Sequence, residues 1–146
     1  TGNMAITVKE TKNDVTVNAK LGNTNFLTRI SSGTKEVVGD EPVSLGGKDE
    51  GFNPYEFLAS ALSMCTAVTL RMYAERKDMN LGEISVNVHL SNNVMDKVAS
   101  FTKTISFENK GLSENELVKL KVIAESCPVN RLLTNTIVVN TSLAGA

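Results

Sequence analysis

Residues 53–77 constrain the fold more than any other stretch, because they predict a long helix with almost no polar surface. Asn53 can cap its N-terminus, Pro54 fits its first position, and Glu56 can complete a capping box. No residue in the run 57–70 is charged, which is typical of a helix buried in a core. That run is shorter than the roughly 20 residues a membrane span requires. We therefore expect a buried core helix rather than a transmembrane one.

The centre of this helix carries a cysteine, Cys65. It lies on an apolar stripe of residues three and four positions apart, which is the spacing of one helix face. The stripe consists of Leu58, Ala61, Leu62, Cys65, Val68, Thr69 and Met72. The pattern predicts that the thiol belongs to the core of the protein.

Strands are predicted in two groups, one before and one after the helix. Before it, strands are indicated at residues 4–10, 14–21, 26–30 and 35–38, followed by a glycine-rich loop at 39–52. After it, strict alternation indicates a strand at 84–90, an answering strand begins at Phe101, and residues 136–139 predict a closing strand. Two strand groups separated by a buried helix indicate an α+β fold rather than a wound parallel sheet.

Two further helices are expected in the C-terminal part. Ser113 and Glu116 have the spacing of a capping box at the start of the first. Pro128 disfavours helical geometry in the residue before it, so we expect this helix to break at Cys127. A short helix at 129–133 would then start from Cys127.

Length and charge narrow the class of protein. The 146 residues fit one domain over residues 1–146, in which 1–3 could be the remnant of an expression tag. Fifteen basic and 16 acidic side chains give a net charge of -1, which argues against nucleic acid or an anionic membrane as partner. Residues 1–25 contain no apolar run that predicts a signal peptide. We expect a soluble cytoplasmic protein whose two cysteines are reduced.

The two cysteines differ in their expected electrostatic environment. Cys127 would sit at a helix N-terminus, where free N–H groups stabilise a thiolate, and Arg131 could add a positive charge. Cys65 lies in an apolar stretch, and burial raises the pKa of a thiol unless a cation or hydrogen bond intervenes. Two plainer interpretations stay open: Cys65 as a small core hydrophobe, and Cys127 as an unreactive residue at a helix break.

Other candidate sites have less support. His89, the only histidine, is out of phase with the apolar residues of its strand, so we expect it to face solvent and expect no zinc site. The Gly46-Gly47-Lys48 run lacks the spacing of a phosphate-binding loop and precedes two acidic residues. Arg29 can simply flank a strand.

The run GFNPYEFLASALSMCTAVTLRMYAERKDMNLGEISVNV, together with the later CPVNRLL, resembles the OsmC/Ohr superfamily of osmotically induced and organic-hydroperoxide-resistance proteins over residues 4–142. The resemblance implies an α+β homodimer in which antiparallel sheets from both chains wrap two long core helices. It also implies a cofactor-free thiol peroxidase acting on organic hydroperoxides. Cys65 would be the peroxidatic cysteine that becomes a sulfenic acid, and Cys127 the resolving cysteine that closes a disulfide. A dithiol, often lipoyl-based, would regenerate the enzyme.

The sequence departs from the classical members where the activating cation is expected. A peroxidatic thiol must be a thiolate, and classical members use an arginine held by a glutamate directly after Asn-Pro. Here Tyr55 follows Pro54, and the carboxylate comes one place later at Glu56. The positions that align with the classical arginines, near Asn23 and Val43, are not basic. Arg29 is the only arginine before the predicted helix and could substitute. Glu56, Arg29 and Tyr55 are therefore candidate supporting residues, and the match is closest to a less characterised OsmC-like branch.

Three functions follow from these observations. The first is a homodimeric peroxidase that uses Cys65 and Cys127 against organic hydroperoxides. The second is a protein that binds a hydrophobic small molecule in an apolar pocket around Leu62, Cys65 and Met72, with thiols that are incidental or redox-sensing. The third is a structural or regulatory dimer. The pKa of the thiols distinguishes the first two, because a peroxidase requires a thiolate at neutral pH.

Overall fold

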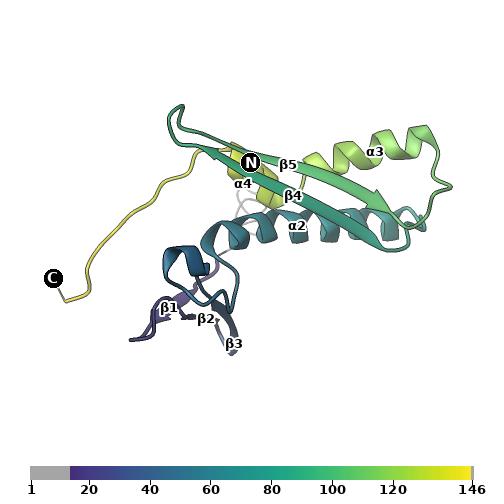
Figure 1. Cartoon of the computed structure of the whole chain (residues 1–146). Coiled ribbons are helices and arrows are strands. Elements are labelled where there is room, and N and C mark those ends of the chain that lie inside the picture. Colours follow the sequence, from purple (N-terminus) through teal and green to yellow (C-terminus); the bar gives the residue numbers. More distant parts are fainter. Residues whose placement is uncertain (1–13, 146) are drawn as a thin grey trace, which may run out of the picture. The chain divides into compact units, whose positions relative to one another are not determined.

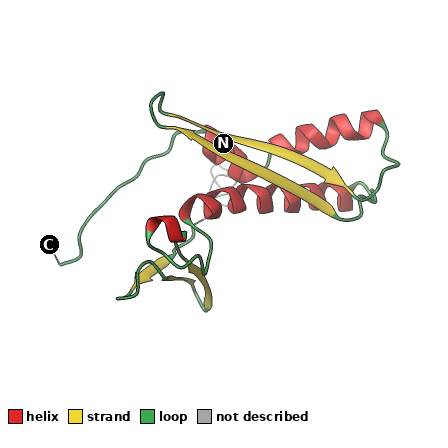
Figure 2. Cartoon of the chain, in the orientation of Figure 1, coloured by secondary structure: helices red, strands yellow, loops and turns green. Residues whose placement is uncertain are grey.

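The computed structural model describes residues 14–145. The chain divides into two compact units, Thr1–Pro54 and Tyr55–Ala146. The expected single domain over residues 1–146 stays a prediction, and the expected strand at 4–10 lies outside the described residues. The α+β composition expected from the sequence is confirmed by helices and antiparallel sheets (Figure 2).

The first unit contains a three-stranded antiparallel sheet in the order β1-β2-β3 (Figure 1). Its strands are β1 (Asn18–Leu21), β2 (Thr28–Ser32) and β3 (Lys35–Gly39). Gly33 makes the turn between β2 and β3 with a φ of 61°, a conformation that glycine adopts without strain. All three strands were expected, although β1 begins later than the predicted 14–21 segment.

The loop after β3 is organised by one buried carboxylate. Asp40 is 4% exposed and accepts backbone N–H bonds from Phe26, Glu41, Lys48 and Glu50 at 3.3, 2.8, 3.3 and 3.2 Å. Burial by itself raises the pKa of Asp40, but these four hydrogen bonds lower it below its ordinary value. The loop contains the short 3-10 helix η1 (Val43–Leu45). The Lys48 N–H of the Gly46-Gly47-Lys48 run thus donates its hydrogen bond to the Asp40 carboxylate of the protein itself.

The second unit packs a β-hairpin and a helix along α2 (Pro54–Arg76), as Figure 1 shows. The hairpin consists of β4 (Ile84–Asn93) and β5 (Val98–Phe107), which pair along their whole length from Ile84↔Phe107 to Asn93↔Val98. Two helices follow, α3 (Glu114–Glu125) and α4 (Pro128–Thr134). The shared core consists of Leu70, Tyr73, Ala74, Leu81, Leu120 and Ala124, with Ile84, Ile105 and Phe107 of the hairpin packed against it.

Helix α2 buries a different face from the one expected. Its buried residues are Leu62, Thr66, Leu70, Tyr73 and Ala74. Three members of the predicted stripe are instead half exposed, Leu58 at 49%, Val68 at 39% and Met72 at 56%. The prediction was wrong because α2 is apolar nearly all round, so spacing could not tell which face the hairpin covers. By length and composition α2 could also cross a membrane, although a core helix passes the same test.

The elements after α2 mostly agree with the sequence patterns. In β4, Ile84, Val86, Val88 and Leu90 are partly buried, and His89 is exposed as expected. The capping box of α3 is present: the Glu116 N–H donates to Ser113 Oγ at 3.1 Å, and the Ser113 N–H donates to Glu116 Oε1 at 2.8 Å.

The closing strand expected at residues 136–139 is wrong for this chain. The segment after α4 leads away from the hairpin as a coil (Figure 1), and residues 136–139 belong to no assigned strand. Val138 and Val139 are 74% and 83% exposed. A strand needs a neighbouring strand to accept its backbone hydrogen bonds, and among the described residues none lies beside this segment.

Candidate redox site

The site forms where α3 ends and α4 begins. α3 stops at Glu125, and Cys127 is the N-cap of α4, with Pro128 at the first helical position. This is the break that the Cys127-Pro128 pair predicted, and it is confirmed. Two helix ends therefore meet within three residues, one offering free carbonyls and the other free N–H groups.

Cys127 is fully buried at this junction, with 0% exposure. Its Sγ accepts a hydrogen bond from the Asn130 N–H at 3.4 Å, as an N-cap side chain does. It also lies 3.5 Å from Thr66 Oγ1 of α2, in a contact where either atom can be the donor. The thiol is therefore surrounded by polar partners although no solvent reaches it.

Cys65 faces the same turn of α4 from the middle of α2. Its Sγ accepts a hydrogen bond from the Val129 N–H at 3.4 Å. Cys65 is partly exposed, and both cysteines are reduced. Consecutive N–H groups of one helix turn thus serve the two sulfurs, and each thiol acts on the pKa of the other. The two cysteines, 62 positions apart in the numbering, form one site.

A cation reaches this site from β5. Lys103 Nζ donates to Thr66 Oγ1 at 3.1 Å and to the Ala124 carbonyl at 2.7 Å. Ala124 belongs to the last turn of α3, where carbonyls lack helical partners and a positive charge is favourable. Lys103 therefore ties β5 to the end of α3 and to the hydroxyl beside Cys127.

These contacts act on the two thiols in opposite directions. Burial raises the pKa of Cys65, and the neighbouring Cys127 raises it further because a second negative charge is disfavoured, although the Val129 N–H opposes both. Burial would also raise the pKa of Cys127. There, however, the hydrogen bonds from Thr66, Asn130 and Cys65 and the charge of Lys103 together lower the pKa below its ordinary value. The pair thus favours a thiolate at Cys127.

The groups that shift the pKa values of the two thiols include none of the supporting residues named from the sequence. Tyr55 and Glu56 are exposed in the first turn of α2, where the Tyr55 hydroxyl accepts a 3.5 Å bond from Asn92 Nδ2. Arg29 is exposed on β2 in the first unit. Arg131, expected to add charge near Cys127, is exposed on α4, and the cation that acts on Cys127 is Lys103 instead. Arg131 lies in the last turn of α4, after the turn that holds the sulfurs, whereas Lys103 comes from β5.

Sequence analysis missed both Thr66 and Lys103. Lys103 did leave a trace in the sequence, because it is in phase with Phe101, Ile105 and Phe107 on the inner face of β5. A lysine at a core-facing position needs polar partners inside the protein. Thr66 gave no such indication, since a threonine on a largely apolar helix has many structural explanations.

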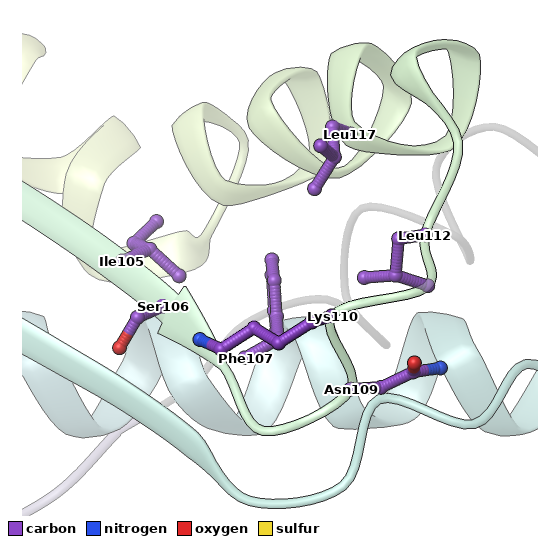
Figure 3. Close-up of a pocket in the computed structure, with 7 residues that line it drawn as sticks. All are labelled: Ile105, Ser106, Phe107, Asn109, Lys110, Leu112 and Leu117. Carbon is purple, nitrogen blue, oxygen red and sulfur yellow. The ribbon is translucent and has the colours of Figure 1, made fainter.

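A pocket of about 280 Å³ lies near the end of β5, between this strand and α3 (Figure 3). It is lined by Ile105, Ser106, Phe107, Asn109, Lys110, Leu112 and Leu117. Neither cysteine lines it, so this is not the apolar pocket expected around Leu62, Cys65 and Met72. Among residues 14–145, no group of three histidine, cysteine or acidic side chains is arranged to hold a metal ion.

Comparison with known proteins places this arrangement in a family. The family model described as OsmC-like protein matches residues 47–142, a range that contains α2, both cysteines and Lys103. The chain therefore belongs to the OsmC-like family. Among curated proteins, none matches the sequence.

Solved structures share the fold at low sequence identity. A Psychrobacter arcticus protein named for an osmotic stress and detoxification response is 20% identical with a TM-score of 0.71, over 83% of this chain and 89% of that one. An OsmC-like protein from Mycoplasma pneumoniae is 20% identical with a TM-score of 0.67, over 84% and 89%. An organic hydroperoxide resistance protein of Bacillus subtilis is 22% identical with a TM-score of 0.56, over 82% and 90%. These identities establish the fold alone.

Proposed function

We propose that this protein is a thiol peroxidase that reduces organic hydroperoxides through Cys65 and Cys127. The observation that carries the proposal is the placement of both sulfurs on consecutive N–H groups, Val129 and Asn130, of one helix turn. Two sulfurs held on one helix turn are the partners that we propose close a disulfide during turnover. Proteins of the same fold that are named for organic hydroperoxide resistance supply the substrate class.

The reduction of one hydroperoxide takes two electrons. The two cysteines supply them together when they become a disulfide. Cys65 loses its proton as its sulfur attacks the terminal oxygen of the peroxide, the O–O bond breaks, and the alkoxide takes a proton and leaves as an alcohol. Cys65 is then a sulfenic acid. The Cys127 thiolate attacks the Cys65 sulfur, an S–S bond forms, and hydroxide takes a proton and leaves as water. An external dithiol then reduces the disulfide and is itself oxidised to a disulfide.

We also propose a homodimer working in the cytoplasm with a lipoyl-type or similar dithiol as reductant. The apolar surface of α2 supports the dimer, because Met64, Val68 and Met72 are 70%, 39% and 56% exposed in the single chain. A second copy would cover this apolar surface.

The test is peroxide consumption by the reduced protein, supplied with a dithiol and given either cumene hydroperoxide or hydrogen peroxide. We expect fast turnover of the organic peroxide and its loss in Cys65→Ser. Cys127→Ser should stop after one turnover with a sulfenic acid on Cys65, which dimedone labels and mass spectrometry detects. The wild type should instead accumulate an intramolecular disulfide when the dithiol is omitted. Turnover no faster than that of the dithiol alone would contradict the proposal.

A further inference from the structure

Lys103 brings a positive charge to the inner face of the hairpin. Its neighbours in phase on β5, Phe101 and Ile105, are apolar and partly buried, as is Lys103 itself. The two acceptors of its ammonium group are a hydroxyl and a backbone carbonyl, on Thr66 and Ala124. Neither partner is a carboxylate, so neither neutralises the lysine. The charge is therefore available to stabilise an anion beside it.

Thr66 connects this charge to Cys127 through a single hydroxyl proton. Thr66 Oγ1 lies 2.8 Å from the Leu62 carbonyl, 3.1 Å from Lys103 Nζ and 3.5 Å from Cys127 Sγ. An ammonium group only donates, and a carbonyl only accepts. The hydroxyl proton must therefore go either to Leu62 or to Cys127.

The two choices correspond to the two protonation states of Cys127. When Cys127 is a thiol, its S–H can donate to Thr66 Oγ1 while the hydroxyl donates to the Leu62 carbonyl. When Cys127 is a thiolate, the hydroxyl can rotate and donate to Sγ, and Lys103 continues to donate to Oγ1. A rotation about one bond satisfies every group in both states, so the arrangement accommodates the negative charge without leaving a polar atom unpaired.

We propose that Lys103 and Thr66 are positioning residues that make Cys127, rather than Cys65, the thiolate of the reduced cysteine pair. The roles that follow for Cys127 in catalysis rest on the proposed peroxidase function. Cys127 would take the Cys65 proton as Cys65 attacks the peroxide and return that proton to the departing alkoxide. Restored as a thiolate, Cys127 would then attack the Cys65 sulfenic acid. One residue would thus serve as base, acid and nucleophile in succession.

The charges that face Cys127 come from three elements. Among the described residues, the titratable groups that act on it are Cys65 of α2 and Lys103 of β5, while α4 contributes the Asn130 N–H. From the end of α3, the Ala124 carbonyl holds Lys103 in place. Arg131 of α4 and Glu125 of α3 are exposed. Lys103 is therefore the cation to remove.

The test titrates Cys127 alone in reduced Cys65→Ser protein, using the ultraviolet absorbance of the thiolate against pH. Lys103→Gln keeps a side-chain N–H that can donate to Thr66 but removes the charge. It should lower the Cys127 thiolate fraction roughly tenfold at a pH below the pKa of Cys127. Lys103→Arg should restore most of the thiolate, and Lys110→Gln, at an exposed lysine, should leave the titration unchanged.

Thr66→Val in the same background is the second variant, which keeps the lysine but removes the hydroxyl. It should also lower the thiolate fraction, because the hydrogen bond from Thr66 is the largest contribution that lowers the pKa of Cys127. Thiolate fractions equal to that of the Cys65→Ser parent in both folded variants would overturn the inference. The titration requires no peroxide, so a wild type that fails to consume peroxide would contradict the proposed function and leave this measurement intact.

Discussion

Replacing Thr66 by valine tests whether its hydroxyl also holds the second unit together. Thr66 is 0% exposed, and valine has nearly the same shape, so the substitution removes hydrogen bonds without opening a cavity. Lys103 loses one of its two acceptors, Thr66 Oγ1 at 3.1 Å, and keeps the Ala124 carbonyl. The change therefore removes the bond between α2 and β5 together with the weaker contact of Thr66 to Cys127.

The expected cost can be estimated bond by bond. A hydrogen bond to a charged group contributes roughly 1.5–3 kcal/mol, and the contact to Cys127 adds less because sulfur is a weak partner. The Leu62 carbonyl loses the hydrogen bond from the Thr66 hydroxyl but keeps its helical N–H partner, so it is not left unpaired. The extra buried methyl group of valine returns about 0.8 kcal/mol. We therefore expect the free energy of unfolding to fall by about 1–2 kcal/mol, or on the order of 2–8 °C in Tm.

The measurement is urea unfolding of the reduced protein at one fixed protein concentration, because association would shift the apparent stability. Thr104→Val is the matched control, since Thr104 is an exposed residue of the same strand as Lys103. The control should stay within about 0.5 kcal/mol of the wild type. If Thr66→Val also stays within that range, the Lys103–Thr66 bond does not stabilise the fold, and the reasoning is wrong.

Two further predictions concern other parts of the chain. The lowered pKa of Asp40 means that its contribution to stability is complete above its unfolded pKa of about 4 and is lost as the pH falls through the lower folded value. Asp40→Asn replaces one carboxylate oxygen by an amide nitrogen that cannot accept a hydrogen bond. At neutral pH it should speed hydrogen exchange either at the Lys48 and Glu50 amides or at those of Phe26 and Glu41, according to which oxygen is lost. Unchanged exchange at all four amides would contradict this. For the dimer, sedimentation should show two copies for the wild type and fewer for Met64→Glu, while Met95→Glu, a 90% exposed site in the β4–β5 turn, should behave like the wild type. A monomeric wild type would rule out the dimer.

Local patterns determined the elements on either side of the site. The Cys127-Pro128 pair predicted the break between α3 and α4 because proline restricts the residue before it, and this restriction needs no tertiary contact. The Ser113 capping box and the alternation in β4 are equally local, since each depends on residues only two or three positions apart. The run 57–70 gave the central helix for the same reason.

Tertiary structure decided which faces meet. α2 is apolar nearly all round, so only the packing of the hairpin against it could place Thr66, rather than Val68, on the buried face. Lys103 and Cys127 are 24 positions apart in the numbering, and no local rule relates a strand residue to the N-cap of a later helix. The sequence by itself therefore determined that two thiols exist and that one begins a helix. The lowered pKa of Cys127 has causes from other elements, a hydrogen bond from Thr66 of α2 and the charge of Lys103 of β5. Both reach the site only after β5 packs across α2 and α3, because electrostatic stabilisation follows distance in space rather than distance along the chain.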